Sequence, residues 1–300
     1  MHLKTYFDRV EKFLETPSLL PKLIIIYGPT ACGKTGLSIE LAKYLKTEVI
    51  SADSRQIFRY MDIGTGKVTS EEMQWIPHHM LDIQSPDEDY SVGAYQKEVF
   101  PIINAIHARG KVPILCGGTG LYLDAVAFHF DIPPMEPDWE YRNSLDQIRL
   151  EKWNEYLWNI LHEKDPTYAQ TIHPNSHHAV IRALEVFEKT GKSKSELLLK
   201  NTPLFDVLFI TPYDGDRAKL YQKINTRIEE MFRNGLEAEV RNILEKEYSR
   251  DCKGLSTIGY KEVIEYMDNK CTLEECISKI QQWNRNYAKR QLTWFRKYES

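Results

Sequence analysis

The chain has 300 residues, of which 42% are hydrophobic, and a formal net charge of −4 at pH 7. This composition supports one large domain or a domain with an insertion, and the acidic balance excludes a wholesale basic coat for nucleic acid but not a local basic patch. No apolar run reaches the length of a membrane span, and the five cysteines show neither a C-x-x-C pair nor zinc-finger spacing. We therefore expect a cytoplasmic protein with reduced thiols and no membrane contact.

The first sixteen residues, MHLKTYFDRVEKFLET, place apolar side chains at helical spacing and predict a short helix packed on the domain. Leu23 to Tyr27 is a short β-branched run that predicts a buried strand. Residues 28–35 then spell G-x-x-x-x-G-K-T, and an amphipathic helix follows. Strand, glycine loop and helix in this order predict a phosphate-binding loop.

The residue types in this loop suit a phosphate and a magnesium ion. The two glycines, Gly28 and Gly33, let backbone N–H groups point inward, and Lys34 supplies a charge for phosphate oxygens. The Thr35 hydroxyl is expected to hold Mg²⁺. Cys32 is either a reactive thiolate or a small filler, and we favour the filler. The predicted diphosphate- or nucleotide-binding set is Gly28, Pro29, Thr30, Ala31, Cys32, Gly33, Lys34 and Thr35.

Further strands are predicted at 47–51, 112–116 and 207–211, with helical stretches between them. This alternation indicates an α/β fold, a P-loop NTPase-like parallel sheet flanked by helices. The carboxyl ends of these strands would bring Asp53 and residues 117–119 to one edge with the phosphate loop. Residues 126–182 are helical and aromatic-rich and predict an insertion domain, so the catalytic core spans 1–125 and 183–300, with a helical C-terminal region.

The strand at 112–116 ends in Gly-Gly-Thr, where an ordinary NTPase has a magnesium-organising Asp. Asp53 is the only acid that closely follows a strand. It is either an acid–base group beside the phosphates or a turn and helix-cap residue, and position alone favours neither.

The last twenty residues carry five cations against one acid. On a helix, Arg285, Lys289 and Arg296 fall opposite a set of four aromatic side chains, which we expect to pack inward: Trp283, Tyr287, Trp294 and Tyr298. The cationic face is either a solvated surface or a contact for a phosphate backbone.

Taken together, these motifs resemble the tRNA dimethylallyltransferases, also called tRNA isopentenyltransferases, of the bacterial type. The matching blocks cover nearly the whole chain: GPTACGKT (28–35), SADSRQIFRYMDIGTGK (51–67), PHHMLDI (77–83), GGTGLYLDA (117–125), IHPNSHHAVIRALEV (172–186), GLEAEV (235–240), TIGYKEV (257–263) and YAKRQLTWFR (287–296). The resemblance implies transfer of a dimethylallyl group from dimethylallyl diphosphate to the exocyclic N6 of an adenosine beside the anticodon, with release of diphosphate. It also suggests a monomer.

The resemblance assigns roles residue by residue. Asp53 would be the general base, Thr119 would help hold the adenine amine, and Arg217 in DGDRAKL would bind diphosphate. Contacts with the tRNA anticodon stem-loop are implied for two blocks and for an arginine in the insertion: Asp53, Ser54, Arg55, Gln56, His178, Ala179, Val180, Ile181, Arg182 and Arg142, to which the C-terminal cations Arg285, Lys289 and Arg296 are added.

Three other functions stay open from the sequence. An adenylate isopentenyltransferase would share the loop and Asp53 but would not need the Trp-rich insertion or the basic terminal helix. A P-loop small-molecule kinase would consume ATP, and the missing strand-end acid argues against it. A non-enzymatic RNA-binding module would have no use for the set of Asp53, Thr119 and Arg217.

Overall fold

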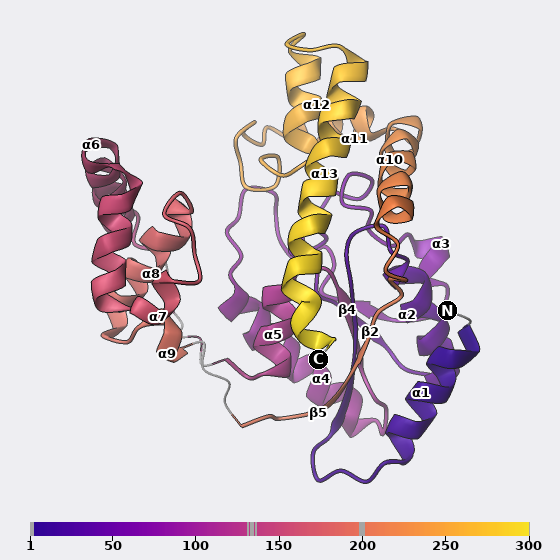
Figure 1. Ribbon diagram of the computed structural model, residues 1–300. Coiled ribbons are helices and arrows are strands. Elements are labelled where there is room, and N and C mark those ends of the chain that lie inside the picture. Colours follow the sequence, from indigo (N-terminus) through magenta and orange to yellow (C-terminus); the bar gives the residue numbers. More distant parts are fainter. Residues whose placement is uncertain (1–2, 131, 133–134, 136, 198–201, 300) are drawn as a thin grey trace. The chain divides into compact units, whose positions relative to one another are not determined.

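The computed structural model describes residues 3–130, 132, 135, 137–197 and 202–299 (Figure 1). The chain folds as two compact units, unit 1 (residues 1–127 and 204–300) and unit 2 (residues 128–203). The predicted insertion began at 126 and ended at 182, so its start lies close to the observed boundary and its end falls inside a helix of unit 2. That helix, α8 (His177–Thr190), packs against α6 (Trp139–Lys164) and carries core residues of unit 2.

Unit 1 is built on a five-stranded parallel sheet with the order β3-β2-β4-β1-β5. The strands are β1 (Lys22–Tyr27), β2 (Val49–Ser51), β3 (His78–His79), β4 (Ile114–Gly117) and β5 (Asp206–Ile210). Four of them were predicted. Because β3 has only two residues, it offers no periodic pattern from which it could be predicted.

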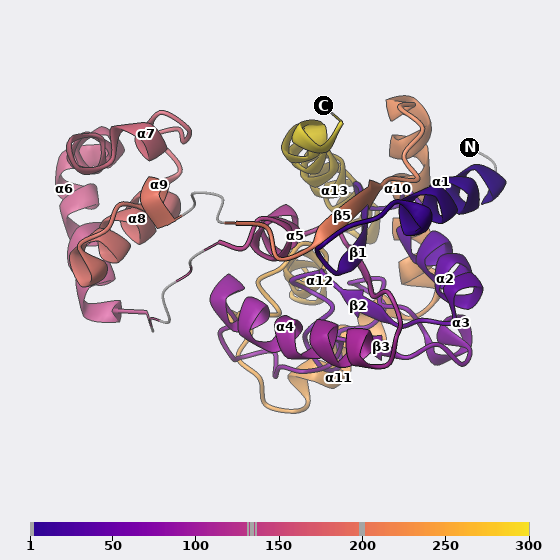
Figure 2. The ribbon, with the colours of Figure 1, turned by 90° about the horizontal axis from the view of Figure 1, so that it is seen from below.

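Helices cover both faces of the sheet (Figure 2). On one face, α1 (Leu3–Glu15) and α2 (Lys34–Leu45) bury apolar side chains against Ile24 and Ile26 of β1. On the other lie α4 (Val92–Ala108) and α5 (Gly120–Ala127). The short helix α3 (Ser70–Met73) follows the segment that leaves β2. The predicted N-terminal helix and the P-loop NTPase-like architecture are therefore confirmed.

Four helices complete unit 1: α10 (Arg217–Arg233), α11 (Leu236–Leu244), α12 (Tyr260–Met267) and α13 (Leu273–Phe295), which ends in a 3-10 turn (Arg296–Tyr298). They enclose a second apolar core around Ile228, Leu236 and Tyr260. A capping box opens α13, where the Thr272 hydroxyl accepts from the Glu275 N–H and the Glu275 carboxylate accepts from the Thr272 N–H.

Unit 2 consists of α6, α7 (Pro166–Ala169), α8 and α9 (Lys194–Leu197). Its core is formed by Leu157 and Leu161 of α6 with Val180 and Leu184 of α8. In the part of the chain that the structure describes, no helix has the length and apolar character required to cross a bilayer.

Candidate active site

The phosphate loop follows β1 and has the predicted geometry. Gly28 and Gly33 have φ values of 147° and 98°, which favour glycine, and Gly33 caps the start of α2. The N–H groups of the first turn of α2 are thus available to an anion. Lys34 Nζ donates to the carbonyl oxygens of Gly28 at 3.0 Å and Pro29 at 2.8 Å.

Cys32 is packed as the small filler that we favoured. It is buried and shares an apolar cluster with Leu220 and Ile224 of α10 and with Ala288 of α13. A Cβ at Gly28 would lie only 2.8 Å from its sulfur, so the loop closes tightly over this side chain.

A cavity of about 270 Å³ lies at the carboxyl edge of the sheet and brings together segments that are far apart in sequence. The phosphate loop contributes Thr30, Ala31, Lys34 and Thr35, and the other walls come from Asp53 to Gln56, Gly64 to Gly66, Cys116, Gly117, Ile224, Arg227, Ile228, Met231, Thr257, Ile258, Asn284, Tyr287, Arg290 and Gln291. A second, more open hollow shares Lys34, Thr35 and Arg227 with it, so the loop faces both. The lining combines the cationic side chains of Lys34, Arg55, Arg227 and Arg290 with the apolar wall that Ile224, Ile228 and Met231 of α10 form.

Asp53 and Thr119 meet at the ends of β2 and β4. The Thr119 hydroxyl accepts from the Ser54 N–H at 2.9 Å, and the Thr119 N–H donates to the Ala52 carbonyl at 3.1 Å. Asp53 Oδ1 accepts from the Arg55 N–H at 2.9 Å. Both predicted roles of Asp53 are thus compatible with its position, because one carboxylate oxygen forms a turn while the residue lines the cavity.

Arg217 is not brought to this cavity. It is exposed at the start of α10, where its Nε donates to the Tyr221 hydroxyl at 2.8 Å. Ten residues later on the same helix, or about 15 Å along its axis, Arg227 lines both hollows. Arg227 Nη2 donates to the Gly66 carbonyl at 3.3 Å, burial lowers its pKa, and the charge of Asp53 opposes that shift. Of these two arginines of α10, Arg227 and not Arg217 lines the cavity, to which Arg55 and Arg290 also contribute.

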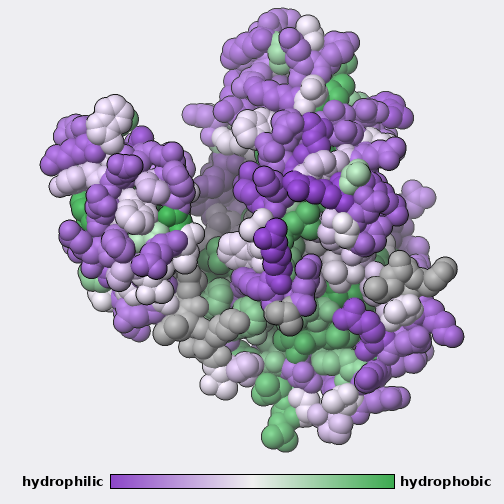
Figure 3. Space-filling model, in the orientation of Figure 1, coloured by the Kyte–Doolittle hydropathy of each residue, from purple (hydrophilic) through white to green (hydrophobic). Residues whose placement is uncertain are grey.

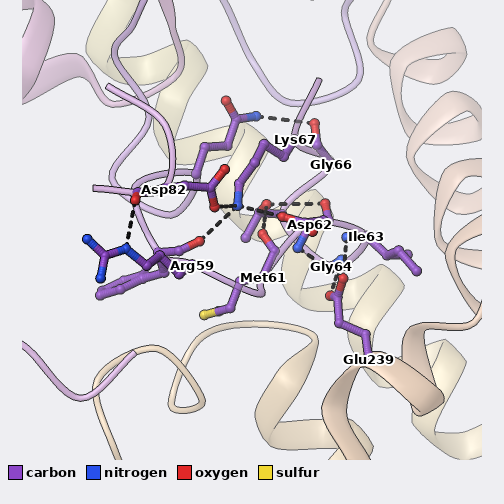
Figure 4. Close-up of polar contacts among 12 residues, drawn as sticks. Arg59, Met61, Asp62, Ile63, Gly64, Gly66, Lys67, Asp82 and Glu239 are labelled. Carbon is purple, nitrogen blue, oxygen red and sulfur yellow. Dashed lines mark hydrogen bonds and ion pairs between the residues drawn. The ribbon is translucent and has the colours of Figure 1, made fainter. Parts of the chain in front are cut away.

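The segment that carries Gly64 to Gly66 into the cavity is anchored by Lys67 (Figure 4). Lys67 is 8% exposed, and its Nζ donates to Asp62 Oδ1 and Asp82 Oδ1, both at 2.6 Å, and to the Phe58 carbonyl at 2.8 Å. A buried ammonium with two carboxylates and a carbonyl is fully satisfied. Lys67 therefore acts in the fold rather than on a ligand.

Glu239 of α11 holds the same segment from the other side (Figure 4). Its carboxylate accepts from three successive backbone N–H groups, those of Asp62, Ile63 and Gly64, at 2.7 to 3.1 Å, and from the Tyr260 hydroxyl at 2.6 Å. These contacts fix the backbone beside Arg227.

Helix α13 brings Asn284, Tyr287, Arg290 and Gln291 to the cavity. Burial raises the pKa of Tyr287 to about 12, with a further increase from Asp53 that Arg55 and a hydrogen bond with Thr119 oppose, so this phenol stays protonated at neutral pH. The prediction of a packed aromatic face is only partly correct, because Trp283 and Trp294 are 43% and 42% exposed.

The predicted tRNA contacts divide by environment. Ser54, Arg55 and Gln56 line the cavity, and His178 is exposed on α8. Ala179 is half-buried, whereas Val180 and Ile181 are buried in the core of unit 2 and offer no side-chain contact to a partner. The implied contact of this block with tRNA stays a prediction, which for Val180 and Ile181 would have to involve the backbone because α8 turns their side chains inward.

The arginines of unit 2 have an internal partner. Glu185, 0% exposed, accepts from Arg142 Nη2 at 2.9 Å and also pairs with Arg182. On α13, by contrast, Lys289 and Arg296 are exposed, as predicted, while Arg285 is half-buried and donates to Asn225 Oδ1 at 2.6 Å. Figure 3 shows that hydrophilic side chains predominate over α11, α12 and the upper part of α13.

Arg227, Tyr287 and Gln291 were not predicted as site residues. A signal for Arg227 exists, since α10 carries a buried stripe at Leu220, Ile224 and Ile228, and an arginine beside such a stripe must be held near the core. The sequence gives no comparable indication that Gln291 enters the site.

Comparison with known proteins identifies the family of this chain. The profile of the IPP transferase family matches residues 56–298. A tRNA dimethylallyltransferase of Bacillus mycoides is 47% identical over 92% of this chain and 87% of its own length, and one from Caldanaerobacter subterraneus is 44% identical over 93% and 90%. The solved tRNA isopentenylpyrophosphate transferase of Bacillus halodurans superposes with a TM-score of 0.65 at 43% identity, covering 92% of this chain and 86% of that one.

A eukaryotic dimethylallyltransferase acting on tRNA superposes with a TM-score of 0.75 at 33% identity, covering 92% of this chain and 70% of that one. The family profile and these relatives all extend over most of the sequence. The chain therefore belongs to the IPP transferase family and is a prenyl-transferring enzyme that acts on tRNA.

Proposed function

We propose that the chain transfers a dimethylallyl group from dimethylallyl diphosphate to the exocyclic N6 of an adenosine adjacent to the anticodon in tRNA. The observation that carries this proposal is one cavity that joins the phosphate loop, with Lys34 and Thr35, to Asp53 and to an apolar wall, while Thr119 holds the neighbouring Ser54 N–H. A small-molecule kinase has no need of an apolar wall for a prenyl tail, and a non-enzymatic RNA-binding module has no need of a general base.

The diphosphate would lie against the phosphate loop. Ionisation at the allylic carbon places negative charge on the departing diphosphate, and Lys34, Arg227 and the N–H groups at the start of α2 would stabilise that charge. In Arg227 the site has a desolvated cation that donates to the Gly66 carbonyl, which leaves it suited to an anionic ligand.

Mg²⁺ fits this arrangement as an ion held mainly by the substrate. Among the described residues no cluster of three His, Cys, Asp or Glu side chains could hold a metal, and Mg²⁺ commonly combines few protein ligands with phosphate oxygens. The Thr35 hydroxyl, which lines the cavity, would be the protein ligand. When bound, the ion would neutralise charge on the diphosphate.

The dimethylallyl tail would lie on the apolar wall. Ile224, Ile228 and Met231 share one face of α10 at i, i+4 and i+7, and all three line the cavity beside Arg227. A ligand with an anionic end and an apolar end therefore meets matching surfaces on one helix.

At the acceptor end, the adenine N6 attacks the allylic carbon. The carbon–oxygen bond to diphosphate breaks, the carbon–nitrogen bond forms, and the N6 proton passes to the Asp53 carboxylate. The Thr119 hydroxyl and the protonated Tyr287 would orient the adenine. The adenine must leave its stack to reach these groups, at a cost of a few kcal/mol.

We propose that this protein contacts the anticodon stem-loop of tRNA and that Lys289 and Arg296, at the C-terminal end of α13, bind its phosphates. We also propose that the protein is a monomer and acts in the cytoplasm.

Mass spectrometry of tRNA nucleosides after incubation with dimethylallyl diphosphate should detect a C5 addition to adenosine. Replacing the stem-loop by AMP, or the donor by ATP, should abolish turnover. Turnover on AMP instead would favour an adenylate isopentenyltransferase.

Asp53→Asn tests the proposed base. The rate of the chemical step should fall by roughly 10²–10⁴-fold, because the amide cannot take the N6 proton, while tRNA affinity stays near that of the unsubstituted protein. Single-turnover kinetics and a filter-binding titration measure the two quantities. An unchanged rate would remove Asp53 from the mechanism.

A further inference from the structure

Gln291 joins three segments that meet at the cavity. This side chain of α13 is 5% exposed, and both the oxygen and the nitrogen of its amide form hydrogen bonds. Oε1 accepts from the Thr30 N–H of the phosphate loop at 2.8 Å, and Nε2 donates to the Gly118 carbonyl at 2.9 Å. One buried amide thus connects the donor side of the cavity, the segment before Thr119 and the C-terminal helix.

The backbone around Gly118 is shaped for this contact. A Cβ at Gly118 would lie 2.4 Å from Gln291 Nε2, and one at Gly117 would lie 2.1 Å from the Ala52 carbonyl oxygen. Residues 117–118 therefore lie between the end of β2 and the Gln291 amide with no room for a side chain. Thr119, which follows directly, takes its position from this segment.

Helix α13 is itself locked in place beyond Gln291. Asp124 of α5 is 1% exposed and accepts from Trp294 Nε1 at 3.0 Å, and it also pairs with Lys297 and Tyr298. A Cβ at Gly120 would lie 2.3 Å from the Trp294 ring. Because these contacts fix the register of α13, Gln291 reaches the phosphate loop from a rigid support.

We propose that Gln291 is a positioning residue that sets, from α13, the orientation of the phosphate loop and of the Thr119 segment. This inference rests on the proposed function, since it concerns how the same cavity is aligned. The Thr30 N–H is directed to α13 instead of to the diphosphate, which fixes how the rest of the loop faces the donor. The same amide holds the Gly118 carbonyl and so keeps the Thr119 hydroxyl on the Ser54 N–H.

Gln291→Leu tests the proposal, because leucine fills the space but leaves the Thr30 N–H and the Gly118 carbonyl without their partner. An unsatisfied buried pair and a misplaced loop should lower kcat by roughly 10–100-fold and raise the inhibition constant of inorganic pyrophosphate by about tenfold. The Kd for the anticodon stem-loop should change by less than about twofold, because the exposed cations of α13 are untouched. Gln282→Leu, an exposed position on the same helix, is the matched control.

Gly118→Ala perturbs the same contact without altering Gln291, and it should shift kcat and the pyrophosphate constant in the same direction. The double variant Gly118→Ala/Gln291→Leu should lose much less activity than the sum of the two single losses, since both act on one contact. All assays are run well below the melting temperature of each variant.

The outcomes separate this inference from the proposed function. Variants that melt earlier but keep kcat and the pyrophosphate constant would overturn the positioning role and leave Gln291 as a packing residue. Additive losses in the double variant would also overturn it. If the unsubstituted protein modifies no adenosine in tRNA, the proposed function itself fails.

Discussion

Arg142 and Arg182 of unit 2 differ from Arg227 of unit 1 in what neutralises them. In unit 2, Arg142 and Arg182 converge on Glu185. Burial alone would raise the pKa of this carboxyl, but hydrogen bonds from Arg142, the Asp138 N–H and Arg182 hold it below its usual value. In unit 1, no carboxylate of the described residues forms an ion pair with Arg227, which donates to the Gly66 carbonyl. A cation with its own buried carboxylate stabilises a fold, whereas a desolvated cation without one is available to an anionic ligand.

The largest effect is expected for Arg227→Gln, which tests whether Arg227 serves an anionic ligand. Loss of a buried charge at the departing diphosphate should lower kcat/KM by roughly 10²–10³-fold, measured by steady-state kinetics with varied dimethylallyl diphosphate. Arg217→Gln, on the same helix but outside the cavity, should stay within about threefold. Equal losses in both variants would contradict the assignment of the diphosphate contact to Arg227 instead of Arg217.

Glu185→Gln tests the structural half of the comparison. It leaves two partly buried guanidinium groups without their carboxylate, and the free energy of unfolding should fall by about 2–3 kcal/mol, measured by urea denaturation. Glu188→Gln, exposed on the same helix, should change it by less than about 0.5 kcal/mol.

The pH dependence of the unfolding free energy tests whether Glu185 is charged in the folded protein. Because the folded-state pKa of Glu185 is lowered, its contribution is present above the unfolded pKa of about 4.3 and is lost as the pH falls through the folded value. The difference in unfolding free energy between Glu185→Gln and the unsubstituted protein should therefore shrink in acid. A difference independent of pH would show that Glu185 is neutral in the folded protein.

Met231→Ala probes the apolar wall beside Arg227. Shortening this side chain should make room for a longer tail and raise the ratio of kcat/KM for geranyl diphosphate over dimethylallyl diphosphate by about tenfold. Leu236→Ala, buried in the same cluster but outside the cavity, should destabilise the protein and leave the ratio unchanged. If Met231→Ala instead raises only the KM for tRNA, this wall faces the adenine.

The smallest expected effect concerns the exposed cations of α13. Replacing Lys289 and Arg296 by Gln should reduce the slope of log K against log salt concentration by about 2 and weaken tRNA binding several-fold. Lys279→Gln on the same helix, where the lysine pairs with Glu265, should leave the slope unchanged. A slope unaffected by the double replacement would identify these cations as solvated surface.

Much of unit 1 could be predicted because its signals are local. The phosphate loop, four strands and the position of Asp53 depend on short patterns that one strand or one turn can satisfy. Arg227 was missed although the apolar stripe of α10 indicates it, because Arg217 also lies beside that stripe and packing decides which of the two faces the cavity. The end of the insertion was missed for a related reason, since the periodicity of α8 does not reveal that α6 is its partner.

In unit 2 the sequence suggested that Arg142 and Arg182 contact tRNA, whereas in the structure both pair with Glu185 of the same unit. Glu185 lies between Leu184 and Val186 in an apolar stretch of α8, which hints at a buried acid in need of cations. Without the fold, neither Arg142 nor Arg182 could be matched to it.

The position of Lys34 affects which anions the phosphate loop can accept. Its ammonium already donates to two carbonyl oxygens of its own loop, so an incoming anion must offer more than these two neutral acceptors do. A chloride ion carries one charge and no oxygen atoms, whereas a diphosphate supplies several charged oxygens at once. We therefore expect the loop to prefer a diphosphate to a monovalent anion, because the anion competes with carbonyl oxygens of the loop's own backbone for Lys34.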